Sequence, residues 1–134
     1  MTPEEVVQAV KVVAFDSAVD GTVKHLESGP DGRGLQPRSV ALSDWYNGLA
    51  AEDRLMVIES VRDAAHAAVF GVMCVLDGVR VVDKAPDVGL RLTATDQLGV
   101  STKLTDSDSC ELHDEFNALG HPPSEPWPPR QEGV

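Results

Sequence analysis

The stretch from Ala51 to Leu76 constrains the fold most, because its pattern is that of one long helix. Apolar residues recur every three or four positions through its first half, the period of a helix with one buried face. These residues are Leu55, Ile58, Val61 and Ala65. From Ala64 onward only His66 is polar until Asp77. A helix that is apolar all round is surrounded by protein, so we expect its second half to be almost wholly buried.

The segments on either side of this helix predict a small α+β fold. Thr2 and Glu5 form a capping box that starts a first helix, and Gly21 is absorbed in it. After Asp77 and Gly78, residues alternate between apolar and polar with the two-residue period of half-buried strands. In chain order we expect a first helix over residues 3–28, a short helix capped by Ser43 and Asp44, the long buried helix, an antiparallel β-meander of two or three strands (79–82, 90–95, 100–104) and a C-terminal helix ending at Gly120.

Length and composition predict one domain with a tail. A chain of 134 residues is near the commonest size of a single domain. We expect one α+β domain over residues 1–120. Residues 121–134 hold five of the nine prolines, a composition typical of an extended or disordered segment.

The charge of the chain restricts its partners. Eleven Lys and Arg residues against 22 Asp and Glu residues give a net charge of −11. Such a surface repels phosphate backbones and anionic lipids, and no two basic residues are adjacent, so we expect neither a nucleic-acid nor a membrane partner. The opening residues Met1–Glu5 are acidic where a signal peptide is basic, and two cysteines make no disulfide framework. These features favour the cytoplasm.

Three segments together resemble a group of small, acidic, uncharacterised bacterial proteins. The segments are Trp45-Tyr46-Asn47 with Leu49 and Glu52-Asp53-Arg54; Ala68-Val69-Phe70-Gly71 followed by Cys74 to Arg80; and Leu112-His113-Asp114 with Phe116-Asn117. The resemblance covers the middle of the chain and implies a bacterial cytosolic protein with the element order derived above. It implies no activity. Ala50 stands where a helix-capping Ser would be expected.

One set of side chains has the spacing of a metal site. Glu59, Asp63 and His66 lie on one face of the long helix, since they are four and three residues apart. Helical bundles use an acidic residue and a histidine at this spacing to hold metal ions, and Asp16 and Asp20 on the first helix could supply opposing ligands. The structural alternative is simpler: the two carboxylates form a solvated stripe, and the histidine is hydrogen-bonded at the edge of the core.

A second polar group surrounds the start of the last helix. His113 and Asp114 begin that helix and could join Asp77 and Arg80 near the end of the long helix. A histidine beside carboxylates can serve as a general base, although adjacent helical residues such as His113 and Asp114 do not orient each other. In the structural alternative, the negative charge of Asp114 interacts favourably with the helix dipole. His113 then packs against a neighbouring backbone or caps one of its groups.

No motif in the sequence identifies a reaction. The acidity and the long buried helix favour a non-enzymatic protein-interaction module without a cofactor, which binds a protein partner or associates with itself. If the first and long helices bury more surface than one small chain can cover, a dimer would complete the core. The alternative is a divalent-metal-binding or hydrolytic protein that uses the helix-borne carboxylates and histidine. A small-ligand sensor with a pocket between meander and helices is a third class.

Overall fold

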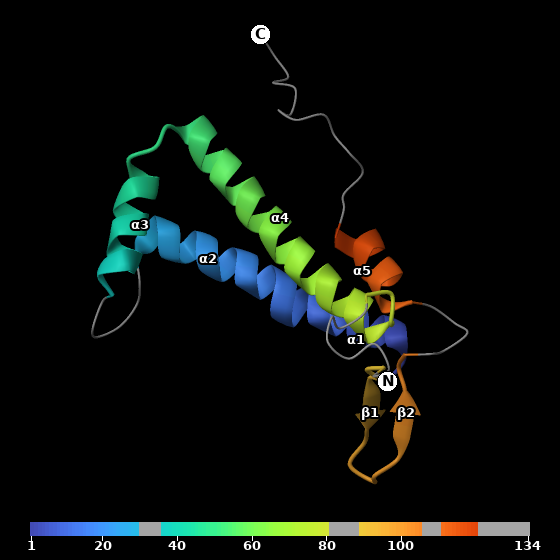
Figure 1. Cartoon of the computed structure of the whole chain (residues 1–134). Helices are drawn as coiled ribbons and strands as arrows, with labels where there is room; N and C mark the ends of the chain where they lie inside the picture. The colour runs from blue at the N-terminus through green and yellow to red at the C-terminus, as the bar shows by residue number, and fades with distance from the viewer. Residues whose placement is uncertain (30–35, 81–88, 106–110, 121–134) are drawn as a thin grey trace, which may run out of the picture. The chain divides into compact units, whose positions relative to one another are not determined.

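The computed structural model describes residues 1–29, 36–80, 89–105 and 111–120, and it shows a mainly helical α+β chain (Figure 1). A two-stranded antiparallel sheet and a C-terminal helix follow the long helix, as the sequence predicts. The elements are α1 (Pro3–Val10), the π-helix η1 (Lys11–Asp16), α2 (Ser17–Ser28), α3 (Pro37–Asn47), α4 (Ala51–Leu76), β1 (Thr93–Thr95), β2 (Ser101–Lys103) and α5 (Leu112–Gly120).

The chain forms two compact units. Unit 1 comprises Met1–Val7 and Met73–Val134, and unit 2 comprises Gln8–Val72. The long helix α4 therefore contributes its last residues to unit 1 and the rest to unit 2. A single domain over residues 1–120 stays a prediction, and the proline-rich tail lies outside the described residues.

The first helical segment begins and continues as the sequence indicates. The Thr2 N–H donates to Glu5 Oε2 at 2.8 Å and the Glu5 N–H donates to Thr2 Oγ1 at 3.3 Å, which is the predicted capping box. The helix passes through η1, where Lys11 Nζ contacts Asp16 Oδ2 at 2.8 Å across five residues. At its end the Ser17 backbone N–H donates to the Val12 carbonyl, five residues back, which is the hydrogen bond that defines a π-helix.

Helix α3 begins earlier than the sequence predicts, and this changes the role of Ser43. Pro37 occupies the first turn, where proline is tolerated, so Ser43 lies inside the helix and does not cap it. Its buried hydroxyl donates to the Leu26 carbonyl at 2.9 Å. The Asn47 amide donates to the carbonyls of Leu26 and Glu27, both at 3.2 Å. Since the last carbonyls of a helix lack partners inside it, α3 completes the end of α2.

Arg54 closes the corner between α3 and α4. Its guanidinium donates to the carbonyl of Asn47 at 2.9 Å and to that of Leu49 at 3.1 Å. The same group lies 5.8 Å from the centre of the Tyr46 ring, within the range of a cation–π contact. Tyr46 is 2% exposed. Tyr46, Asn47 and Arg54 are thus structural, because they join three consecutive helices.

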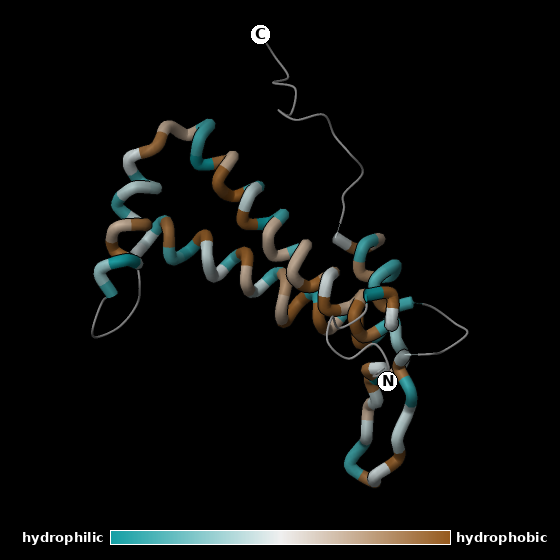
Figure 2. The backbone as a smooth tube through the Cα atoms, in the orientation of Figure 1, coloured by the Kyte–Doolittle hydropathy of each residue, from teal (hydrophilic) through white to brown (hydrophobic). Residues whose placement is uncertain are grey.

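Helix α4 has the predicted bounds, but the prediction that its second half is wholly buried is wrong for most of that half. Met73 and Cys74 are buried, whereas Ala64, Ala67, Ala68 and Val72 are exposed. Figure 2 shows hydrophilic residues recurring along the first half of the helix and hydrophobic colours prevailing toward its end. The reason is that neighbours within the chain cover one flank of the helix and leave the other uncovered.

The hairpin lies where strands 90–95 and 100–104 are predicted, although each strand is only three residues long. Thr93, Ala94 and Thr95 pair with Lys103, Thr102 and Ser101. In the turn, Asp96 Oδ1 accepts the N–H groups of Leu98 and Val100, both at 2.9 Å, and Gly99 has φ 81°, a conformation that favours glycine. The strand predicted at 79–82 is not formed by its first two residues, which lie in a bend after α4, and residues 81–82 are outside the described ranges.

Unit 1 has its own core, drawn from several segments. Leu112 and Phe116 are completely buried on one face of α5. The other buried apolar residues among those described in this unit are Pro3, Val6, Val7, Met73, Cys74 and Leu104. Within the described ranges, no helix is both long enough and apolar enough to cross a membrane.

Candidate functional site

The polar cluster of unit 1 is built around His113, at the beginning of α5. His113 is the second residue of the helix, so its backbone N–H has no partner inside the helix. Its flanking residue Leu112 is fully buried, which holds the first turn of α5 against the core. The side chain of His113 is 12% exposed.

Asp77 orients His113 from the end of α4. The Asp77 carboxylate oxygen Oδ2 accepts the His113 backbone N–H at 2.8 Å and contacts His113 Nδ1 at 2.7 Å. Its side chain is 5% exposed. Gly78, with φ 74°, ends α4 immediately afterwards and lets the chain turn away from the helix axis. The two residues are 36 positions apart, so Asp77 supplies α5 with a cap from a distant part of the chain.

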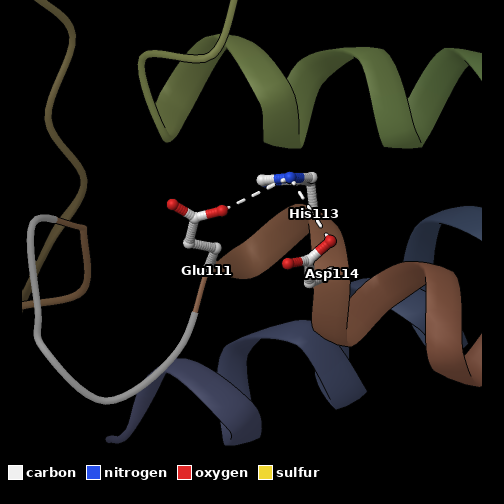
Figure 3. Close-up of side chains that lie close together, drawn as sticks. All are labelled: Glu111, His113 and Asp114. Atoms are coloured by element: carbon white, nitrogen blue, oxygen red, sulfur yellow. Dashed lines mark ion pairs between the residues drawn. The ribbon is translucent and has the colours of Figure 1, made fainter.

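The other edge of the imidazole faces two more carboxylates. His113 Nε2 lies 3.5 Å from Glu111 Oε2 and 3.4 Å from Asp114 Oδ1. Figure 3 shows both carboxylates turned toward this nitrogen, one from the residue before α5 and one from its first turn. The side chains of Glu111 and Asp114 are 60% and 77% exposed. Among the described residues, this is the one group of three or more potential ligands whose donor atoms lie within 4.8 Å of one another.

The geometry of this cluster suits a positive charge at Nε2. Asp77 Oδ2 contacts Nδ1, which leaves the Nε2 edge of the ring between the carboxylates of Glu111 and Asp114. A bound cation would satisfy them. Zinc binds nitrogen and oxygen at about 2.0–2.2 Å in a tetrahedron, which separates neighbouring donors by roughly 3.3–3.6 Å. The two separations from Nε2, 3.4 and 3.5 Å, fall in that range.

Asp77 would have a defined part in such a site. A metal-bound histidine donates its other ring N–H to a carboxylate or carbonyl, which fixes the ring and raises the basicity of the ligand nitrogen. The buried Asp77 carboxylate makes this contact already. Arg80, the remaining candidate at this place, is exposed in the bend after α4, where its backbone N–H donates to the Cys74 carbonyl at 3.2 Å.

The five residues predicted as ligands on the helices lie in unit 2 and are not gathered in one group. Glu59, Asp63 and Asp20 are exposed, and Asp16 pairs with Lys11. No three of the five have donor atoms within 4.8 Å of one another. Metal binding by Glu59, Asp63, His66, Asp16 and Asp20 stays a prediction.

His66 has aromatic neighbours in unit 2. Its ring packs edge-on against Phe15, with centroids 6.2 Å apart, and stacks nearly parallel to Phe70 at 6.0 Å. Phe15 is 2% exposed. Among the contacts described, this histidine belongs to the packing between η1 and α4.

Unit 2 also presents an uncharged surface, which we call the outer ridge of α4. It is a row of five residues spaced four apart, so that they form one continuous strip along the helix. All five are exposed, with Met56 at 48% and Val72 at 57%. The ridge consists of Met56, Ser60, Ala64, Ala68 and Val72. The Ser60 hydroxyl donates to the Met56 carbonyl at 2.9 Å, so the helix itself satisfies this polar group.

Sequence reasoning named three members of the His113 cluster and missed Glu111 as a fourth. The spacing of Asp108 and Glu111 also fits a capping box, but Asp108 lies outside the described residues. The signal that could have indicated it is the Glu-x-His-Asp spacing, which places all three side chains around one helix start. Comparison with protein-family models, curated proteins and solved structures finds no match to this chain.

Proposed function

We propose that this protein is a non-enzymatic protein-interaction module of the bacterial cytoplasm, and that the outer ridge of α4 is its binding surface. One observation carries the proposal: in a chain of net charge −11, the ridge offers an uncharged, exposed strip from Met56 to Val72. At 1.5 Å per residue the strip is about 24 Å long. Single exposed apolar residues are ordinary on protein surfaces, whereas a contiguous apolar row is typical of an interaction site.

The small core of unit 2 supports this proposal. Among its described residues, the buried side chains are Phe15, Val19, Leu26, Ser43 and Tyr46. Large apolar side chains remain between 44% and 74% exposed on the same unit, namely Val12, Val13, Leu42, Trp45, Leu55, Met56 and Val72. Burying such a side chain contributes about 1.5–3 kcal/mol, so a partner that covers several of them gains appreciable affinity.

Affinity capture from the native cell extract tests the surface, with two variants of the full chain. Ala64→Glu places a charge at the middle of the ridge. Arg62→Glu changes the net charge by more, at an exposed position on the opposite side of the same helix, and is the matched control. We expect wild type and Arg62→Glu to capture the same proteins and Ala64→Glu to lose them. Identical capture by all three chains, or none by any, contradicts the proposal.

A second candidate function, binding of a divalent cation, is supported by the geometry at His113. Glu111, His113 and Asp114 offer one nitrogen and two carboxylate donors, a set suited to zinc or manganese. The buried Asp77 would act as the carboxylate that orients the ligating histidine. The cation would supply a fixed positive charge where three carboxylates converge on one imidazole.

Elemental analysis and calorimetric titration with Zn²⁺ and Mn²⁺ test this candidate. We expect one equivalent of metal in wild type, with weaker binding in Glu111→Gln and Asp114→Asn, whose side chains are exposed. Asp77→Asn should lower the affinity by about 10–100-fold, the usual effect of removing a ligand's orienting partner. Glu52→Gln, on unit 2, is the control and should bind as wild type does. Absence of stoichiometric binding, or equal binding by all variants, contradicts a site at His113.

A further inference from the structure

The sizes of the residues along the outer ridge of α4 fit a second helix that crosses it at the middle. The residues at the centre are Ser60, Ala64 and Ala68, and the two larger side chains, Met56 and Val72, stand at the ends. When two helices pack through rows spaced four residues apart, their axes cross at about 50° and lie roughly 8–10 Å apart. Small side chains allow the closest approach at the crossing, and larger ones fill the space where the axes diverge.

The order of sizes is also symmetric about Ala64. Met56 and Val72 are each eight residues from it, and Ser60 and Ala68 are each four residues from it. A symmetric dimer requires a surface that is complementary to itself, with each contact made twice. This ridge meets that condition. When a second copy packs against it in the reverse direction, the large end residues of one copy meet the large end residues of the other, and the small central residues meet each other.

From this pattern, and resting on the proposed interaction function, we infer that two copies of the chain pack α4 against α4 in antiparallel orientation, with the two-fold axis at Ala64. Ala64 then faces Ala64 of the second copy, Ser60 faces Ala68, and Met56 lies toward Val72. All of these residues belong to unit 2.

The charges of the helix select the antiparallel orientation. Every charged residue of α4 precedes Ala64: these are Glu52, Asp53, Arg54, Glu59, Arg62 and Asp63. A parallel pair would bring the two charged halves together and align the helix dipoles, which repel when parallel. The antiparallel pair places each charged half beside the uncharged half of the other copy.

Charge also distinguishes a second copy from a basic partner. A basic protein would bind the carboxylates of Glu59 and Asp63, which flank the ridge, rather than the ridge itself. Two chains of net charge −11 repel each other, so their contact must be uncharged, and salt should strengthen it by screening the repulsion. A single helix crossing buries little surface and belongs to the class of interfaces that bury less than about 1,200 Å² in total. We therefore expect a weak dimer that dissociates on dilution.

Light scattering and sedimentation of the full chain test the dimer. We expect the dimer fraction to rise with protein concentration from about 1 μM to 1 mM, the range of weak interfaces, and to rise again with added NaCl. Since Ala64 would face itself, Ala64→Glu sets two like charges together and should raise the dissociation constant more than about tenfold. Arg62→Glu should remain dimeric. A chain that is monomeric at every concentration overturns the second-copy inference, while capture of another protein through the ridge would leave the proposed function standing.

Cysteine cross-linking tests the orientation, in a chain with Cys110→Ser, since Cys74 is buried. Ala64→Cys should form a disulfide-linked dimer under mild oxidation. Ser60→Cys alone should not, but it should link to Ala68→Cys when the two variants are mixed. Arg62→Cys, also at an exposed position but on the opposite side of the helix, is the control. A self-linked Ser60→Cys dimer indicates parallel packing, and linking by Arg62→Cys at the rate of Ala64→Cys indicates random collision; either result overturns the inference.

Discussion

Replacing Asp77 with Ala should destabilise unit 1 more than changing any exposed carboxylate of the His113 cluster, because one buried oxygen holds two donors of α5. Asp77 Oδ2 takes the His113 backbone N–H at 2.8 Å and Nδ1 at 2.7 Å. Loss of a helix cap costs about 0.5–2 kcal/mol, and loss of a hydrogen bond to a charged group about 1.5–3 kcal/mol. Since both bonds share one oxygen and are not additive, we expect Asp77→Ala to cost about 2–4 kcal/mol.

Two further variants divide this effect into its parts. His113→Ala removes the side-chain contact and leaves the backbone N–H bonded to Asp77, so it should cost less than Asp77→Ala. Asp77→Asn keeps an acceptor oxygen of the same shape and loses the negative charge beside the start of α5. Such a charge at a helix N-terminus contributes about 0.3–1 kcal/mol at an exposed site and up to about 2 kcal/mol when partly buried. A double-mutant cycle between Asp77→Ala and His113→Ala isolates the coupling between the two side chains.

The measurement is hydrogen exchange of the amides in residues 112–116, read by NMR, together with thermal unfolding followed by circular dichroism. Exchange reports the local opening of α5 even where the two units do not unfold together. Asp114→Asn, on a side chain that is 77% exposed, is the control and should change stability by less than about 0.5 kcal/mol. If the amides of residues 112–116 are as strongly protected from exchange in the Asp77→Ala variant as in the Asp114→Asn variant, the cap contributes nothing to stability. That result would refute the reasoning.

Three further predictions concern the scaffold. Asn47→Ala should cost about 1–2 kcal/mol in urea unfolding, since two carbonyls at the end of α2 lose a donor, whereas the exposed Asn117→Ala should be neutral. Phe116→Ala should cost about 3–5 kcal/mol and lower the melting temperature, while Leu98→Ala, at a position 88% exposed in the hairpin turn, should leave it unchanged; equal melting temperatures would contradict the assignment of the core. Gly99→Ala should cost about 1–2 kcal/mol because of its φ of 81°, and Gly89→Ala, in open space, should cost little; the comparison fails if both variants melt alike.

The elements that could be predicted from the sequence are those with strong local signals. Thr2 and Glu5 cap the first helix, Gly78 ends α4, and Asp96 to Gly99 make the hairpin turn, as their residue types indicate. The start of α3 was mispredicted because Pro37 follows a stretch rich in glycine and proline, which is typical of a loop. In that context a proline in the first turn of a helix is hard to distinguish from a proline that prevents one.

The burial of α4 and the partner of His113 depend on distant parts of the chain. Ala64, Ala67 and Ala68 have the composition of a core, yet no segment of the described chain covers them. His113 and Asp77 are 36 residues apart, and spacing rules for helices connect only residues three or four apart. For the same reason the sequence favoured Asp63 and His66, a pair at helical spacing, although the His66 ring is packed between Phe15 and Phe70.

The two candidate sites can be separated by experiment, because they lie on different units of the chain. The cation site uses residues 77 and 111–114 of unit 1, and the outer ridge of α4 uses residues 56–72 of unit 2. A variant such as Asp77→Asn should therefore weaken cation binding and leave the dimer intact, whereas Ala64→Glu should dissociate the dimer and leave cation binding intact. If either variant changed both properties, the two functions would be coupled, and α4 would be the connection to examine, since it contributes residues to both units.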